Sequence, residues 1–455
     1  MRLGSIDTAI VALYFLFLLI IALRTKRRER SSAEEFLLAG RRLTGPAFVA
    51  TLVSTWYGSI LAVGEYSYLY GISNWLVFGV PYYIAALLFA FFLAGRARRS
   101  RFLSIPDQLE AAYGKPVAIT GTIIVFLITV PAAYILMLGE LLQWFLGGSL
   151  LVWMIAGSAF SLLYVLHGGF RNVIRTDLPQ FVLMYVGFIL LIVIAASQYG
   201  GWDFLKANLP EASLSPTGGL GLPAILVWYF IALQTLIEPT FYQRCYAARS
   251  EKVARRGLLV SVAFWLVFDF LTTFSGLYAR AILGGDAEPM LSYPLLAEQL
   301  LPVGLLGIFF VALVSVVLST VDSYMLLAGQ TLGHDLWKRV RSGVSDTVTP
   351  TRAGLVVASV VAISIATWKQ SAVVIFHDLG SIATSALLLP MVAALYRKIP
   401  LPRGRVLLSM LISGGATAIW SSFGSYGSGY PMEIHPIYVG LGLSILILGP
   451  SLLSK

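Results

Sequence analysis

Long apolar segments recur from one end of this 455-residue chain to the other. A segment of about 20 apolar residues matches the hydrocarbon thickness of a bilayer, and lipid permits only helices or closed barrels to cross it. Charged residues make up 12% of the chain, about half of the fraction in an ordinary soluble domain. The segments are too long and continuous for the alternating pattern of a barrel. We therefore expect an all-α polytopic membrane protein.

The apolar segments divide into thirteen expected spans. They lie at 6–24, 47–70, 74–95, 116–146, 149–168, 172–197, 223–246, 257–283, 301–331, 352–369, 371–396, 404–422 and 434–452. With the N-terminus outside, all but four of the 32 lysines and arginines fall in cytoplasmic loops or at cytoplasmic helix ends. The four exceptions are Arg2, Lys206, Arg280 and Lys369.

This distribution of basic residues follows the positive-inside rule. The main clusters are Arg24-Thr25-Lys26-Arg27-Arg28, Arg96-Ala97-Arg98-Arg99, Arg244 to Arg256, and Lys338-Arg339. We therefore expect a multi-pass protein of the plasma membrane with its N-terminus outside and its C-terminus in the cytoplasm. The net charge of +10 then reflects topology, and we expect no nucleic-acid partner.

Few residues suit catalytic chemistry. The single cysteine, Cys245, allows no internal disulfide and no cysteine metal site. The four histidines are scattered, mostly near the ends of spans, and form no metal or nucleophile constellation. We expect that the protein is not an enzyme, and a membrane-embedded enzyme is the alternative from a different class.

Two expected spans carry an internal break. Span 47–70 contains Ser54-Thr55-Trp56-Tyr57-Gly58-Ser59, and span 223–246 contains Glu238-Pro239, where proline removes a backbone hydrogen bond. Inverted repeats whose first helices are broken at the membrane midplane are a common transporter plan, although glycine and proline are also frequent in ordinary membrane helices. The expected division is 1–46 (first helix and cytoplasmic loop), 47–197 and 223–396 (the two repeats) and 404–455 (two accessory helices).

A polar cluster, Leu318 to Ser323, lies inside the apolar span 301–331. Hydroxyl and carboxylate oxygens are costly at that depth unless they pair or bind a ligand, and they are the ligands that hard cations prefer. Val316, Ser319 and Thr320 stand at i, i+3 and i+4, so they share a helix face. The cluster indicates a cation site; the alternative is that the hydroxyls bond back to their own helix.

Four motifs occur in the order and at the spacing of a known family. They are Leu38-Ala39-Gly40-Arg41-Arg42-Leu43; Gly168-Gly169-Phe170-Arg171 with Thr176-Asp177-Leu178-Pro179-Gln180; Glu238-Pro239 with Gln243-Arg244 and Ala247-Ala248; and Leu318 to Ser323 with Asp335-Leu336-Trp337-Lys338. Over nearly its whole length the chain resembles the sodium:solute symporter family, which contains the proline, sialic acid, pantothenate and sodium/glucose carriers. The resemblance implies a LeuT-type fold of 5+5 inverted repeats with about 13 transmembrane helices.

The resemblance also implies an activity and its ion sites. The protein would import a small polar organic solute by alternating access, with Na+ as the coupling ion and no organic cofactor. The main sodium site would use the backbone carbonyls of Ser54, Tyr57 and Val316 and the hydroxyls of Ser319 and Thr320. A second cation or proton site would use Asp177, Asp322 and Ser323; the alternative for Asp177 is an ion pair with Arg171 or Arg175.

The substrate pocket is expected between the two breaks. Its candidate residues are Trp56, Ser59, Gln234, Thr235 and Glu238, with Tyr57 beside them; secondary candidates are Glu65, Glu140, Gln143, His377 and Asp378, and Asp269 could be structural. Glu238 beside its break favours an amino or cationic group, so we expect an amino acid or related nitrogenous solute. A small carboxylate coupled to sodium or protons is the alternative. The expected partners are this solute and the lipid bilayer, and no obligatory protein partner is evident.

Overall fold

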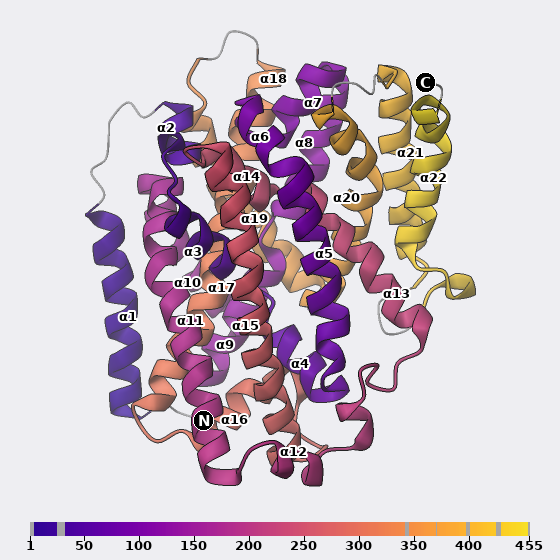
Figure 1. Cartoon of the computed structure of the whole chain (residues 1–455). Helices are drawn as coiled ribbons and strands as arrows, with labels where there is room; N and C mark the ends of the chain where they lie inside the picture. The colour runs from indigo at the N-terminus through magenta and orange to yellow at the C-terminus, as the bar shows by residue number, and fades with distance from the viewer. Residues whose placement is uncertain are drawn as a thin grey trace.

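The computed structural model describes residues 4–24, 32–341, 345–369, 371–396, 401–424 and 429–453, which are helical almost throughout. The helices form one upright bundle, with the described ends of the chain at opposite ends of it (Figure 1). Residues 25–28 of the first expected basic loop, together with Arg2 and Lys455, lie outside the described residues.

The helices keep the order that the apolar segments predict. In the first half they are α1 (Ser5–Leu23), α2 (Ala33–Leu38), α3 (Gly45–Trp56), α4 (Ile60–Tyr70), α5 (Val80–Leu88), α6 (Ala94–Ser100), α7 (Ile105–Tyr113), α8 (Lys115–Thr129), α9 (Ala132–Leu146), α10 (Leu150–Gly168) and α11 (Phe170–Tyr199). They continue as α12 (Trp202–Asn208), α13 (Leu222–Ile231), α14 (Pro239–Ala247), α15 (Glu251–Leu283), α16 (Ser292–Leu300), α17 (Leu305–Gln330), α18 (Lys338–Val340), α19 (Val348–Lys369), α20 (Ala372–Leu395), α21 (Arg403–Ser421) and α22 (Pro436–Leu453).

Each of the thirteen expected spans coincides with a helix or a series of helices, but the count of thirteen membrane crossings is not confirmed. Among the described residues, ten helical segments are long and apolar enough to cross a membrane, and the bent pair α3–α4 makes an eleventh. α21 falls short because arginines, serines and a threonine interrupt its apolar residues, and α22 is a shorter apolar helix.

Both expected breaks are present. The axes of α3 and α4 differ by 61° across the turn Tyr57–Ser59. In the second break, α13 passes through the 3-10 turn Ala232–Ile237 to Glu238, whose extended backbone starts α14 at Pro239. The Glu238 side chain caps α14 by accepting a hydrogen bond from the Thr240 backbone N–H at 3.3 Å, so the residue that ends one helix also begins the next.

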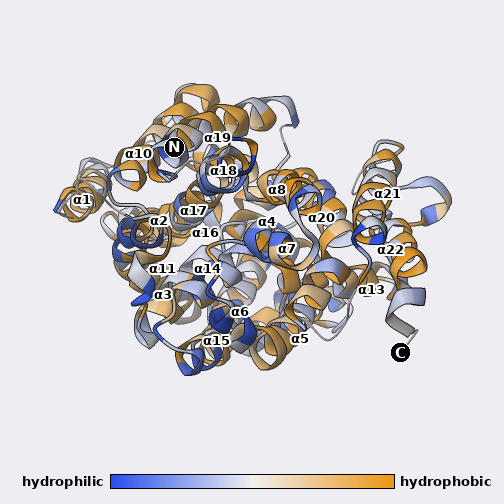
Figure 2. Ribbon diagram, turned by 90° about the horizontal axis from the view of Figure 1, so that it is seen from above, coloured by the Kyte–Doolittle hydropathy of each residue, from blue (hydrophilic) through white to orange (hydrophobic). Residues whose placement is uncertain are grey.

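α17 lies at the centre of the bundle. Its most apolar stretch is 89% buried, whereas the corresponding stretch of α1 is 28% buried. Viewed from above, α1 lies at one edge of the bundle and α21 and α22 lie at the other (Figure 2). The polar residues of α17 therefore face other helices and not lipid.

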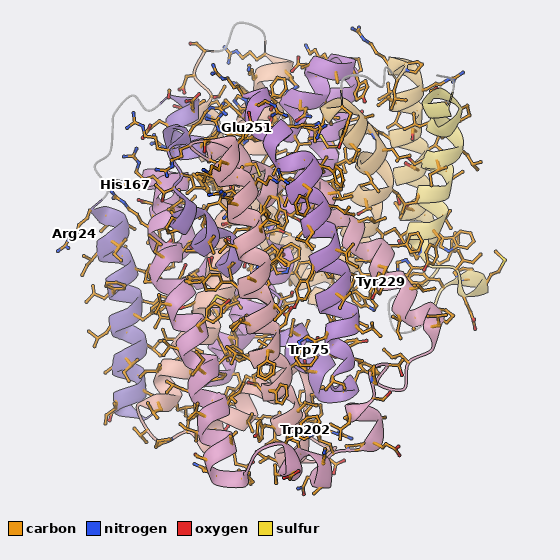
Figure 3. The ribbon with its side chains drawn as sticks, in the orientation of Figure 1. Arg24, Trp75, His167, Trp202, Tyr229 and Glu251 are labelled. Carbon is orange, nitrogen blue, oxygen red and sulfur yellow. The ribbon has the colours of Figure 1, made fainter. Side chains whose placement is uncertain are left out.

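The two ends of the bundle differ in composition. One end, which we call the basic end, carries Arg96, Arg98, Arg99, Lys252, Arg255 and Arg256. Arg24 and Glu251 lie toward this end, while Trp75 and Trp202 lie toward the other (Figure 3). Two arginines of the predicted basic clusters, Arg244 and Arg339, have buried side chains with partners on other helices.

Candidate functional site

A fully buried polar cluster joins the end of α3 to the middle of α17. The Thr320 Oγ1 atom lies 2.8 Å from the Thr55 carbonyl oxygen, and the Ser319 Oγ atom lies 2.9 Å from Ser54 Oγ. α3 stops at Trp56, so no following helical turn donates backbone N–H groups to its last carbonyl groups. Free carbonyl oxygens on one helix thus face hydroxyl oxygens on another.

Close packing at Gly58 makes this approach of the two helices possible. A Cβ atom at that position would lie 2.5 Å from the Cβ, Cγ2 and Oγ1 atoms of Thr320. Side-chain atoms do not approach so closely, so only glycine lets the α3–α4 break rest against α17 here. The glycine that helps to break the span also allows the contact across it.

Four of the five residues of the predicted sodium site lie in this cluster: Ser54, Val316, Ser319 and Thr320. The contact that Ser54 makes is through its hydroxyl and not through the predicted carbonyl. The Val316 carbonyl oxygen lies 3.1 Å from Thr320 Oγ1. The phenol of Tyr57 donates to Asp269 at 2.8 Å, and its backbone, which would supply the predicted carbonyl, belongs to the turn between α3 and α4. Thr55 was missed in the sequence, although its place in the polar run beside Gly58 was the available signal.

Asp177 on α11 lies at the edge of this cluster. One carboxylate oxygen accepts from Ser319 Oγ at 2.6 Å, and the other accepts from the Thr51 hydroxyl. Arg171, one of the two residues considered as its ion-pair partner, pairs with Glu35 instead. The nitrogen that approaches Asp177 is Arg244 Nη2, at 3.9 Å.

The three residues of the predicted second site belong to two separate groups. Ser323 lies 3.0 Å from Thr55 Oγ1 and accepts from Arg244, on the same side as Asp177. Asp322 faces α10, where it accepts hydrogen bonds from Ser161 at 2.6 Å and from Tyr164. Helix geometry explains the difference, because successive residues of α17 point about 100° apart.

A cavity of about 160 Å³ lies between the two breaks. All of the primary pocket candidates line it: Trp56, Tyr57, Ser59, Gln234, Thr235 and Glu238. Asp269 and His377 also line it, whereas Glu65, Glu140, Gln143 and Asp378 do not. Aromatic side chains that the sequence analysis did not select complete the wall: Phe78, Tyr82, Tyr134, Trp228, Tyr324 and Phe376.

Acidic and aromatic groups dominate this cavity. Glu238 accepts from Tyr324 at 3.0 Å, and Asp269 accepts from Tyr57 and Tyr83. Among the described residues that line the cavity, none is a lysine or an arginine. The buried Thr235 hydroxyl has no hydrogen-bond partner within the described part of the chain. A buried polar atom in that condition is suited to bond a ligand.

A histidine pair borders the same cavity. His377 on α20 forms a hydrogen bond with His435 between their Nε2 atoms, and Tyr430 lies 3.2 Å from His377 Nδ1. The Ile437 backbone N–H donates to His435 Nδ1 at 3.3 Å, so the proton of neutral His435 sits on Nε2, facing His377.

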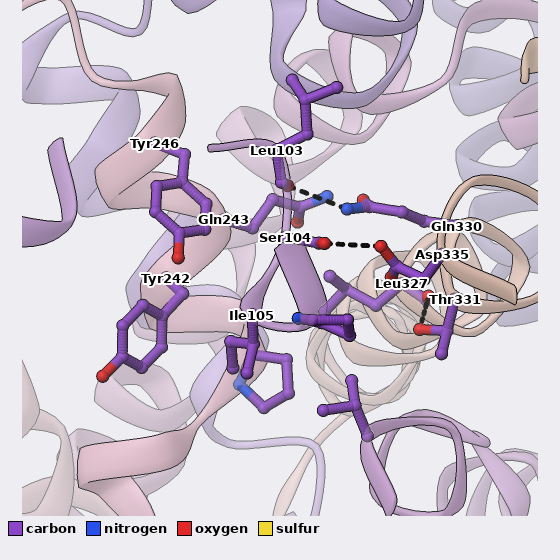
Figure 4. Close-up of a pocket in the computed structure, with 13 residues that line it drawn as sticks. Leu103, Ser104, Ile105, Tyr242, Gln243, Tyr246, Leu327, Gln330, Thr331 and Asp335 are labelled. Atoms are coloured by element: carbon purple, nitrogen blue, oxygen red, sulfur yellow. Dashed lines mark hydrogen bonds between the residues drawn. The ribbon is translucent and has the colours of Figure 1, made fainter. Parts of the chain in front are cut away.

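Near the basic end, a contact joins α7 to the end of α17 and the π-helical turn Thr331–Trp337 that continues α17. We call it the α7–α17 contact, and it surrounds a cavity of only about 20 Å³. Ser104 donates to Asp335 at 2.5 Å, and Gln330 donates to the Leu103 carbonyl at 2.9 Å (Figure 4). Such a volume holds about one water molecule, so the contact closes the space between α7, α14 and α17.

Asp107 extends the contact between α7 and the end of α17. Its carboxylate pairs with Arg339 at 2.9 Å and with His334 at 3.1 Å. Burial would raise the pKa of Asp107, but the hydrogen bond with His334 and the charges of His334 and Arg339 outweigh burial and hold the pKa below its ordinary value. The Asp107 carboxylate is therefore charged at neutral pH.

Comparison with known proteins gives a consistent result. The model of the sodium:solute symporter family matches residues 36–405. The sodium/pantothenate symporter of Escherichia coli (strain K12) is 23% identical over 98% of this chain and 95% of its own length. The sodium/glucose cotransporter of Vibrio parahaemolyticus is 25% identical over 80% of this chain and 75% of its length. The human sodium/myo-inositol cotransporter is also 25% identical, but this chain covers only 58% of it.

Solved structures show the same arrangement of helices. A Na+-coupled sialic acid symporter in a substrate-bound outward-open state superposes with a TM-score of 0.81 over 99% of this chain and 97% of its own, at 17% identity. MhsT in complex with L-phenylalanine superposes with a TM-score of 0.52 over 90% of this chain and 98% of its own, at 15% identity. These likenesses confirm the LeuT-type fold.

Proposed function

The chain belongs to the sodium:solute symporter family and is a sodium-coupled solute symporter, and we propose that its solute is a small molecule with a cationic nitrogen, such as an amino acid or a related amine. The observation that carries this proposal is the charge of the cavity between the breaks. Its described lining has two carboxylates, Glu238 and Asp269, and no lysine or arginine. A carboxylate solute would find no lysine or arginine there.

The aromatic walls of the cavity support the same solute class. An ammonium group within about 6 Å of an aromatic face is attracted by the ring, and the attraction is larger in a desolvated site. Glu238 provides the countercharge, and the unbonded Thr235 hydroxyl can bond a carbonyl or hydroxyl of the solute.

For the coupling ion, we propose the site predicted from the sequence: the carbonyls of Ser54, Tyr57 and Val316 and the hydroxyls of Ser319 and Thr320. The support is the buried cluster that joins α3 to α17 at 2.8–2.9 Å. These ligands are neutral, and they lie where one helix is broken. A cation held there stabilises the contact between the break and α17, and its departure loosens that contact.

The second cation or proton site also stays a proposal, with two candidate places. Asp322 has neutral hydrogen-bond partners, Ser161 and Tyr164, which suit a protonated carboxylate. Asp177 has the hydroxyls of Ser319 and Thr51, with Arg244 nearby.

We propose that the protein works by alternating access, using the sodium site, the cavity and the α7–α17 contact. Sodium bound between α3 and α17 completes the cavity between the breaks, while the α7–α17 contact keeps the basic end closed. Separation of α7 from α17 then opens the cavity toward the basic end, where the ion and the solute leave. We propose that the basic end faces the cytoplasm at the plasma membrane, with the N-terminus outside, because basic residues gather there.

The function is tested on purified protein and in proteoliposomes. A thermal-shift screen of small amines, amino acids, sugars and carboxylates, with sodium or choline, is expected to select a nitrogenous solute that stabilises only in sodium. Uptake of that solute should follow an imposed sodium gradient. Selection of a sugar or a carboxylate would reject the solute class, and uptake unaffected by sodium would reject the coupling.

A further inference from the structure

A groove of about 520 Å³ lies on the surface at the basic end, between α6 with the turn before it and the start of α15. Viewed from above, α6 and α15 lie side by side at one edge of the bundle (Figure 2). Both belong to segments long and apolar enough to cross a membrane, Trp75–Ser100 and Glu251–Leu283, and the groove lies at the basic end of each. In a bilayer, the groove is therefore at the level of the lipid headgroups.

The charge of this groove is strongly positive. A single carboxylate, Glu251, lines it, and that carboxylate pairs with Arg99. Cations therefore outnumber carboxylates five to one in the lining. The five basic residues are Arg96, Arg99, Lys252, Arg255 and Arg256.

Aromatic rings hold two of these cations in place without neutralising them. The Arg96 guanidinium lies 4.0 Å from the centre of the Tyr396 ring, and the Arg255 guanidinium lies 4.9 Å from the centre of the Phe91 ring. A ring attracts a cation through its quadrupole but carries no net charge. Both guanidinium groups are thus positioned and still able to bind an anion.

Two further cations have no countercharge. Within the described part of the chain, the side chains of Lys252 and Arg256 have neither an ion-pair partner nor a hydrogen-bond partner. They stand at i and i+4 on α15, so they share a helix face, where two like charges are destabilising. An anion bound between α6 and α15 would relieve this repulsion.

Apolar side chains continue the groove toward the middle of the membrane. Phe91 and Phe92, which line it, are 49% and 52% exposed, and Val260 and Phe264 lie exposed further along α15. The surface therefore changes from cationic to apolar along the direction in which a phospholipid changes from its headgroup to its acyl chains. A dissolved phosphate ion would use only the cationic part.

We propose that this groove binds the phosphate headgroup of an anionic phospholipid from the surrounding leaflet, with the acyl chains of the lipid against Phe91, Phe92 and α15. Basic pockets between membrane helices are suited to such headgroups. This inference goes beyond the proposed function and depends on neither the solute nor the sodium site.

The experiment measures the thermal unfolding midpoint of the purified chain in mixed micelles of neutral detergent and phosphatidylcholine, with phosphatidylglycerol added in increasing proportion. Wild type is expected to be stabilised in a saturable way, because a ligand that binds the folded state raises the midpoint. The groove variant, Lys252→Gln with Arg256→Gln, should need about 25-fold more phosphatidylglycerol, at about fivefold, or about 1 kcal/mol, for each basic residue.

The matched control is Lys115→Gln with Arg403→Gln. It also removes one lysine and one arginine from exposed positions at the basic end, but neither residue lines the groove. This control should follow the wild-type curve. Both variants change exposed side chains, so both are expected to fold.

Three results would overturn the inference. Equal weakening in the groove variant and the control would mean that the overall charge of the basic end attracts the lipid. Absence of stabilisation of wild type by phosphatidylglycerol would mean that no such lipid binds. In a separate titration, equal stabilisation by inorganic phosphate would mean that the groove binds a dissolved anion and not a lipid.

Discussion

Replacing Gly58 with alanine should weaken sodium binding without removing any proposed ligand. The new Cβ would lie 2.5 Å from three side-chain atoms of Thr320, including its Cβ, so rotation of the Thr320 side chain cannot relieve the clash. Ordinary contact begins at 3.4 Å, so the break must move from α17 by about 0.9 Å. Overpacking of this kind costs about 1–3 kcal/mol. If the cost falls on the sodium-bound state, the sodium dissociation constant rises roughly 5- to 150-fold.

The assay is a sodium titration of the thermal unfolding midpoint in purified protein, which needs no solute. Stabilisation by an ion grows with the logarithm of its concentration above the dissociation constant, so a weaker site shifts the curve to higher sodium. Gly45→Ala is the matched control, because it adds the same methyl group to α3 where nothing lies within 4 Å. An unchanged curve in Gly58→Ala would show that the α3–α17 contact does not form the sodium site.

Two further predictions concern the pocket and the basic end of the bundle. Glu238→Gln should weaken binding of an amine solute by about 10- to 150-fold, the value of a charged hydrogen bond, while the sodium-induced thermal shift remains. Asp107→Asn leaves Arg339 with one charge partner fewer, so the free energy of unfolding should fall by about 3 kcal/mol. Thermal denaturation measures this loss, and Glu110→Gln, which removes the more exposed partner of Arg339, is the control.

Much of the fold was predictable because its signals are local. The length of apolar runs sets the helices, and Gly58 and Pro239 mark their own breaks. The polar run 54–59 and the cluster 318–323 could be assigned to one site because both interrupt long apolar segments. The sequence predicts thirteen spans, more than the structure shows, and the cause is also local. α21 and α22 are apolar but do not reach the length and hydropathy of a crossing.

The rest depended on pairings between distant segments. Arg244 stands beside a run of surface basic residues, and in the sequence its charge is indistinguishable from theirs. Only the packing of α14 against α3 and α17 reveals that it is buried. Asp322 and Ser323 are neighbours in sequence, yet Asp322 accepts a hydrogen bond from α10 and Ser323 accepts one from Arg244. Which face of α17 meets which helix was not encoded locally.

The helical segment that begins with α17 continues through the turn Thr331–Trp337 into α18, so it can tilt as one body. Thr320 in α17 and Asp335 in that turn are 15 residues apart, which is about 22 Å along a helix axis. A tilt of only about 5° at Thr320 would displace Asp335 by about 2 Å, enough to separate oxygen atoms now 2.5 Å apart at Ser104. A tilt that hardly moves the proposed sodium site would thus break the contact with Ser104.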